Sequence, residues 1–171
     1  MLVIAVGNVF RRDDGAGPEL AARVRTLNLP RVTVVEALGD VGLIDEWSGH
    51  DTVILLDAVR SGAEPGTIIR HDLNEAPLPR RWFRLSSHQL GIADAVELAR
   101  RLGAIPPRLI FIGIEGADFG NGVGLSPRVN AALDAAAVLV RNESKPLPRS
   151  RAERAARRKM ARVHTPTHLP E

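Results

Sequence analysis

Short, uninterrupted apolar runs alternate along the chain with segments in which apolar residues recur every three or four positions. Uninterrupted runs of this kind are typical of parallel strands buried on both faces, and the three-to-four spacing is typical of helices with one buried face. The runs predict strands at residues 2–6, 32–35, 52–56 and 109–114, with another at 67–70 after the turn "SGAEPG". The spaced segments predict helices at about 17–27, around 43–47, at 88–102 and from 127 to about 140.

Because strands and helices alternate, we predict an α/β fold, a three-layer α/β/α sandwich with a mostly parallel twisted sheet. Ligands of such sheets bind beyond the carboxyl ends of the strands. The polar residues predicted at those ends are Asn8, Asp13, Asp14, Glu36, Asp57 and Glu115. His88 opens a predicted helix after the proline-rich loop 74–81 and joins them as a candidate.

Composition narrows the possible chemistry. The length of 171 residues suits one domain with a core of its own. The chain has no cysteine, which excludes disulfides, a thiolate nucleophile and a zinc–thiolate site. The apolar runs are too short to span a bilayer, and the first residues lack the basic leader of a signal peptide. We therefore expect a cytoplasmic protein that does not enter a membrane.

Charge divides the chain into two parts. Residues 149–162 hold seven basic residues and one acidic residue, whereas residues 1–148 hold 16 basic and 18 acidic residues. We predict an α/β domain at 1–142 and a basic Pro/Arg-rich tail at 143–171. Such a tail is usually a solvated segment, which we favour over docking to an acidic partner surface. The slightly acidic body argues against nucleic-acid binding.

Each candidate residue has a structural alternative. Gly7 and Asn8 do not begin a phosphate-binding loop, because two carboxylates follow them. One aspartate suffices to cap the helix that begins near Gly17, and for Asp13 we favour this capping role over orienting water. Asp57 either caps the turn after its strand or acts at the sheet edge.

His88 either caps its helix or binds a ligand. A positive helix end disfavours the protonated imidazole and leaves it neutral for metal binding. Asp14, Asp57 and His88 come from three segments that meet at the same predicted edge. Two carboxylates and an imidazole suit a divalent transition metal and leave coordination positions open. Spacing thus favours a metal site of Asp14, Asp57 and His88.

Five stretches, in this order and spacing, resemble the hydrogenase maturation endopeptidases, which process the large subunit of NiFe hydrogenases. They are "VIAVGNVFRRDDGAGPEL" at 3–20, "VILLDAV" at 53–59, "SSHQLG" at 86–91, "FIGIEG" at 111–116 and "GLSPRV" at 124–129. The first matches the family's G-N-x-x-x-x-D-(D/E)-x-x-G pattern. After the second strand, where family members often carry Asp-Gly-Gly-Thr, this chain has Glu36-Ala37-Leu38-Gly39-Asp40, with Glu36 as a possible substitute carboxylate.

The resemblance implies that Asp14 and Asp57 are the two metal-binding carboxylates and His88 the histidine of a catalytic, metal-binding set. It implies a three-layer fold and a large-subunit precursor as partner. It further implies that nickel is delivered in that precursor and recognised there, with other divalent metals able to occupy the site in vitro. On the same resemblance, the enzyme is expected to remove a short C-terminal peptide after a His or Arg in the final cysteine motif.

Two other classes compete with this interpretation. A peptidyl-tRNA hydrolase-like enzyme shares the architecture and an early Gly-Asn, but the acidic body, the lack of tyrosine and the few aromatics argue against RNA binding. A non-catalytic nickel-binding maturation chaperone would bind metal without releasing a peptide.

Overall fold

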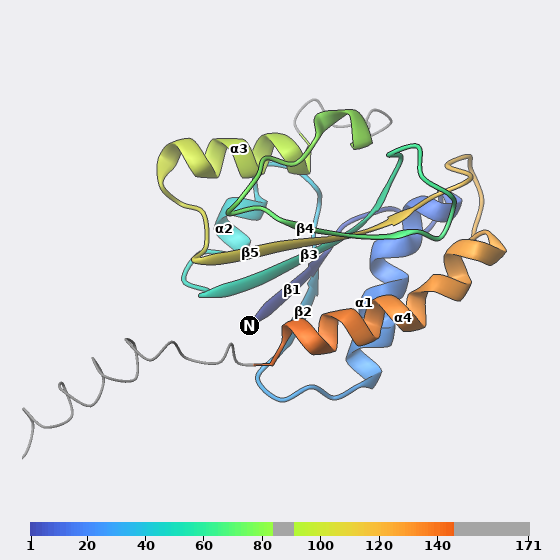
Figure 1. The fold of residues 1–171 in the computed structure, drawn as a ribbon, viewed down its shortest axis with the longest axis horizontal. Helices are drawn as coiled ribbons and strands as arrows, with labels where there is room; N and C mark the ends of the chain where they lie inside the picture. The colour runs from blue at the N-terminus through green and yellow to red at the C-terminus, as the bar shows by residue number, and fades with distance from the viewer. Residues whose placement is uncertain (84–90, 146–171) are drawn as a thin grey trace, which may run out of the picture.

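The computed structural model describes residues 1–83 and 91–145, which form one sheet covered by helices on both faces (Figure 1). The strands are β1 (Leu2–Ala5), β2 (Thr33–Glu36), β3 (Thr52–Val59), β4 (Ile68–Asp72) and β5 (Arg108–Glu115). The helices are α1 (Ala16–Thr26), α2 (Leu43–Glu46), α3 (Ile92–Leu102) and α4 (Pro127–Glu143), with 3-10 turns η1 (Arg12–Gly15) and η2 (Arg80–Phe83).

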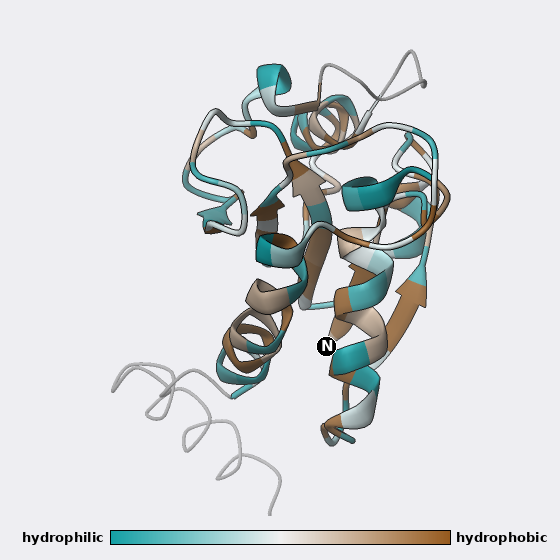
Figure 2. Ribbon diagram, turned by 90° about the vertical axis from the view of Figure 1, so that its right-hand side faces the viewer, coloured by the Kyte–Doolittle hydropathy of each residue, from teal (hydrophilic) through white to brown (hydrophobic). Residues whose placement is uncertain are grey.

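The sheet has the strand order β2-β1-β3-β5-β4. Four strands are parallel, and β4 pairs antiparallel to β5 at one edge. Helices α1 and α4 lie on one face, and α2 and α3 on the other (Figures 1 and 2). This arrangement confirms the predicted three-layer α/β/α fold with a mostly parallel sheet.

Each face of the sheet has its own apolar core. In β1, Val3 and Ala5 pack in the cluster with α1 and α4, whereas Leu2 and Ile4 pack in the cluster with α2 and α3. All four are at most 3% exposed. Because both faces are covered, successive residues are all apolar, which explains the uninterrupted runs in the sequence.

A crevice opens between β1 and β3 at their carboxyl ends. The two strands pair only as far as Ala5 opposite Leu56, while β3 continues beside β5 to the pair Val59 and Glu115. From β1 the chain crosses to β2 through α1 on one face, and α3, which leads into β5, covers the opposite face. This is the topological switch point at which parallel sheets bind ligands.

Two of the differences between predicted and observed boundaries bear on the site. We predicted that β3 ends at Leu56, but it continues to Val59, because β5 still pairs with it after β1 has ended. Asp57 therefore lies within the strand, not after it. The helix predicted from His88 begins at Ile92 in the described part, since Gly91 has an extended conformation (φ −97°, ψ −173°). His88 itself lies outside the described residues.

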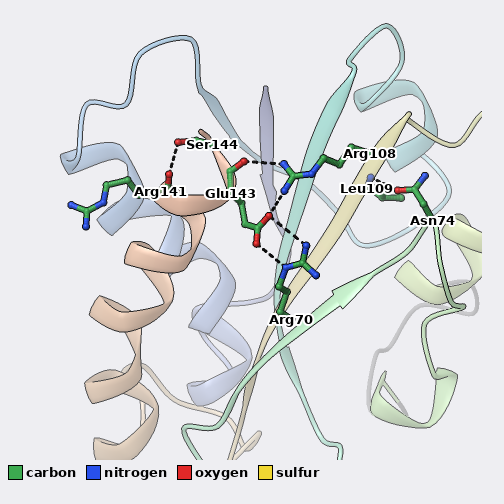
Figure 3. Close-up of polar contacts among 7 residues, drawn as sticks. All are labelled: Arg70, Asn74, Arg108, Leu109, Arg141, Glu143 and Ser144. Carbon is green, nitrogen blue, oxygen red and sulfur yellow. Dashed lines mark hydrogen bonds and ion pairs between the residues drawn. The ribbon is translucent and has the colours of Figure 1, made fainter. Parts of the chain in front are cut away.

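The end of α4 is fixed to the sheet by Glu143, at the opposite end of β5 from the crevice (Figure 3). Its carboxylate pairs with Arg70 of β4, at 2.7 Å, and with Arg108 of β5, which also donates to the Glu143 carbonyl oxygen at 2.9 Å. Burial would raise the pKa of Glu143, but the two guanidinium groups lower it below its ordinary value. The helix thus extends to the start of the predicted tail. In the described ranges, no helix is long and apolar enough to cross a membrane.

Candidate active site

A pocket of about 290 Å³ occupies the crevice between β1 and β3. Its lining includes Asp14, which follows β1, and Asp57, which belongs to β3. Phe83 and Gly91, which flank the undescribed residues 84–90, also line it. The structure therefore brings together two of the three predicted site residues, and the third, His88, lies outside the part of the chain that it describes.

Two glycines allow Asp14 to approach β3. Gly7 has a φ of +134°, and a Cβ added there would lie 2.0 Å from the carbonyl oxygen of Asp14. At Gly17, near the start of α1, a Cβ would lie 2.1 Å from the Val6 oxygen and 2.8 Å from the Leu56 oxygen. Only residues without a side chain let the turn and the helix pack this closely against the strand ends.

Asp57 lies in an environment that disfavours its charge. Its side chain accepts a hydrogen bond from the Ala58 N–H at 2.8 Å, and the residue is 8% exposed. Burial first, and then the negative charge of Asp14, raise the pKa of Asp57 well above its ordinary value. The pKa of Asp14 is also raised by burial, although Arg11 opposes that shift. Two carboxylates in this state are stabilised in their charged form by a cation placed between them.

The hydrogen bonds of Asp13 contradict its predicted role as a helix cap. Helix α1 has no side-chain cap, and Asp13 instead accepts hydrogen bonds from the N–H groups of Ala117, Asp118 and Ser126 and from the Ser126 hydroxyl, at 2.6–2.9 Å. The Ser126 hydroxyl donates to Asp13, and its side chain does not cap α4. Burial raises the pKa of Asp13, but these bonds outweigh it and lower the pKa below its ordinary value. Asp13 therefore joins the Asp14 turn to the loop after β5.

Two other predicted strand-end carboxylates have structural partners. Glu115 is 2% exposed and accepts hydrogen bonds from the Ser61 N–H and hydroxyl and from the Gly62 N–H. It holds the loop that follows β3. Glu36 lines the pocket, and its carboxylate pairs with Arg25 at 3.0 Å.

Sequence reasoning missed the apolar part of the pocket. Phe10, Leu38 and Phe83 line it together with the two carboxylates. The sequence contained a signal for Phe10, since it is an aromatic residue in the turn between a predicted strand and a predicted helix, outside the apolar runs that form the core. The sequence alone does not give the conformation of that turn, which places Phe10 at the pocket.

The donor set fits a divalent cation in part. Within residues 1–83 and 91–145, no group of three or more His, Cys, Asp or Glu side chains is arranged to hold a metal. Asp14 and Asp57 supply two oxygen donors, and the raised pKa of each means that a cation would compete with a proton there. The two donors in the described residues leave most coordination positions of a metal to other groups, which suits a metal that is already bound by another molecule.

Comparisons with known proteins agree with this architecture. Residues 19–143 match the family model of the hydrogenase maturation proteases. The chain is 30% identical over 155 residues to a putative hydrogenase maturation protease of Methanocaldococcus jannaschii, covering 85% of this chain and 96% of that protein. It is 29% identical over 141 residues to the hydrogenase 2 maturation protease of Escherichia coli, covering 80% of this chain and 85% of that protein.

The fold has solved counterparts. The hydrogenase maturating endopeptidase HybD from E. coli superposes with a TM-score of 0.70 and 25% identity, over 84% of this chain and 93% of that one. A solution structure of an endopeptidase from E. coli superposes with a TM-score of 0.67 and 27% identity, over 82% of this chain and 90% of that one. On this sequence and structural evidence, the chain belongs to the hydrogenase maturation proteases, a family of hydrolases.

Proposed function

We propose that this protein is an endopeptidase that removes the C-terminal extension of a NiFe hydrogenase large-subunit precursor after nickel insertion, in the cytoplasm. The observation that carries the proposal is the pairing of Asp14 and Asp57 in one pocket at the switch point of the sheet. The pairing supports a site that binds a cation brought by the substrate.

In this proposal the two carboxylates test whether the precursor holds nickel. Without the ion, burial and the negative charge of Asp14 raise the pKa of Asp57 and disfavour its charged form, so the acidic pair contributes little to substrate binding. With the ion, Asp14 and Asp57 complete its coordination, and we predict that His88 does so as well. Selection then depends on a group that the wrong substrate lacks.

The nickel has a second use in this proposal. A divalent metal polarises a neighbouring carbonyl group and lowers the pKa of bound water. The described residues contribute by holding the ion and the peptide in the crevice. Asp13 does not face the substrate in this scheme, because its two oxygens are occupied by the loop after β5 and the start of α4.

Intact-mass measurement of a large-subunit precursor, nickel-loaded and nickel-free, tests the proposal. The precursor is incubated with wild type, Asp57→Ala and His88→Ala, and with Asp51→Ala as a control at an exposed carboxylate before the same strand. We expect loss of a C-terminal peptide only from the nickel-loaded precursor, and only with wild type and the control.

Other outcomes distinguish the alternatives. Equal cleavage of the nickel-free precursor would refute the nickel test. Metal transfer without peptide release would indicate a maturation chaperone instead. Cleavage by His88→Ala at the wild-type rate would remove His88 from the metal-binding set and leave the two aspartates.

A further inference from the structure

Large apolar side chains are exposed at the end of the sheet that holds the pocket. Of the nine large hydrophobic residues that are exposed in the described ranges, five follow β1, β2 or β5 at this end of the sheet. They are Val9, Phe10, Leu38, Val41 and Val123. Phe10 and Leu38, which are 70% and 68% exposed, line the same pocket as Asp14 and Asp57.

Phe10 is held by its backbone. Its N–H donates to the Asn8 side-chain oxygen at 2.9 Å, and its carbonyl oxygen accepts from the Gly122 N–H at 2.9 Å. The next turn is fixed as well, because the Arg12 N–H donates to the Gly122 oxygen at 2.9 Å. The exposure of Phe10 therefore belongs to an ordered turn. An ordered apolar surface beside a polar site marks a place where a ligand binds.

Leu38 is held from both sides. The preceding Ala37 donates its N–H to the Ala5 oxygen at 2.9 Å, which continues the pairing of β1 and β2. The following Gly39 packs against the end of β1, where an added Cβ would lie 2.6 Å from Val6 Cγ1. Leu38 thus sits on an ordered segment that borders the pocket from β2, while Phe10 borders it from β1.

The pocket therefore combines two kinds of recognition. Its acidic residues suit a cation, and its exposed rim suits an apolar side chain. Its volume of about 290 Å³ lies just below the roughly 300–1,000 Å³ of ligand pockets, a size that suits a small group such as a side chain. In the proposed function, a peptide segment beside the bound nickel brings a cation to the acidic residues and places its neighbouring side chains near the apolar rim.

We propose that Phe10 and Leu38 form an apolar subsite that binds one apolar side chain of the precursor segment lying beside the nickel. This inference rests on the proposed function and adds a second determinant of specificity, one that is independent of the metal. A precursor then has to carry both nickel and an apolar residue at a set position to bind tightly.

Affinity measurements with nickel-loaded and nickel-free precursor test the subsite. The variants are Phe10→Ala and Leu38→Ala, and the matched control is Leu102→Ala, whose side chain is exposed on α3 and lies outside the pocket lining. We expect each pocket variant to weaken binding of both precursor forms by about tenfold, the scale of an apolar pocket contact. Leu102→Ala should bind as wild type does.

Asp57→Asn separates this inference from the proposed function. It should abolish the preference for the nickel-loaded form and leave the effect of Leu38→Ala on the nickel-free form unchanged. A wild type that binds both forms equally would contradict the nickel test but not the subsite. Phe10→Ala and Leu38→Ala proteins that bind as tightly as wild type would overturn the subsite. A wild type that binds neither form would overturn both.

The precursor residue that occupies the subsite is identified by double-mutant cycles. Each apolar residue near the C-terminal extension is changed to Ser, and its effect on affinity is measured with wild type and with Leu38→Ala. At one position the loss should be about tenfold with wild type and near zero with Leu38→Ala, because the contact has already been removed. If the loss of affinity at every precursor position is the same with wild type and with Leu38→Ala, then Leu38 contacts none of these side chains and the proposal is refuted.

Discussion

Replacing Asp13 should destabilise the whole domain, although the residue lies next to the predicted metal-binding Asp14. Its side chain is fully buried and accepts hydrogen bonds from Ala117, Asp118 and Ser126, two of them from Ser126. Asp13→Ala leaves these part-buried donors without an acceptor. A fully buried donor without a partner costs about 1–3 kcal/mol. Water can reach these three N–H groups in part and the Ser126 hydroxyl can turn elsewhere, so the free energy of unfolding should fall by about 3–5 kcal/mol, toward the lower end of the sum for three donors. For a domain of this size the melting temperature should fall by roughly 10 °C.

The matched control is Asp14→Asn at the neighbouring position. Burial raises the pKa of Asp14, so loss of its charge should leave the free energy of unfolding unchanged or increase it. Urea unfolding of wild type, Asp13→Ala, Asp13→Asn and Asp14→Asn at pH 7 measures the difference. Asn at position 13 keeps one acceptor oxygen but turns an amide toward the donors, and it should lie between Ala and wild type.

The pH dependence provides a second check on Asp13. Its pKa is lower in the folded than in the unfolded state, so its contribution to stability is present above the unfolded pKa and is lost as pH falls through the folded pKa. The gap between wild type and Asp13→Asn should therefore narrow in acid. An Asp13→Ala protein within about 1 kcal/mol of wild type at pH 7 would refute the account of these hydrogen bonds.

Three further predictions concern stability. The pKa of Asp57 is raised in the folded state, so the stability that its carboxyl group contributes is present below the unfolded pKa and is lost as pH rises through the folded pKa. Asp57→Asn should therefore have a higher free energy of unfolding than wild type at pH 8 and the same at pH 4, with Asp51→Asn as control. Glu143→Gln weakens the pairing with Arg70 and Arg108 and should lower the free energy of unfolding by about 1–3 kcal/mol in urea at pH 7. An unchanged urea midpoint would show that the ion pairs drawn in Figure 3 do not stabilise the domain. Deletion of 146–171 should leave the melting temperature within 2 °C of wild type, a margin of about 1 kcal/mol, if the predicted tail lies outside the domain.

The fold was predictable because both faces of the sheet are buried. The apolar runs of β1, β3 and β5 have no polar position facing solvent, so their pattern indicates parallel strands under helices. The end of β3 was not predictable, because Asp57 interrupts the apolar run while β5 continues to pair with the strand. Pairing between distant segments decides that boundary, and the local sequence does not contain it.

The site was predictable to the extent that it follows strand ends. Asp14 and Asp57 lie at the switch point because parallel topology places the end of β1 beside Leu56 of β3, next to Asp57. The role of Asp13 was not predictable, because its hydrogen-bond donors lie more than 100 positions away in the sequence. Phe10 and Leu38 were missed because only the folded loops place them at the same pocket. His88 stays a prediction, since it lies outside the described residues.

The central claim is that Asp14 and Asp57 bind the nickel that the precursor carries. X-ray absorption at the nickel edge tests this directly, on nickel-loaded precursor mixed with enzyme and frozen before cleavage. The account predicts an added oxygen contribution around nickel with wild type, reduced with Asp14→Ala and with Asp57→Ala. A nickel spectrum that is the same with wild type, with either variant and without enzyme would contradict it.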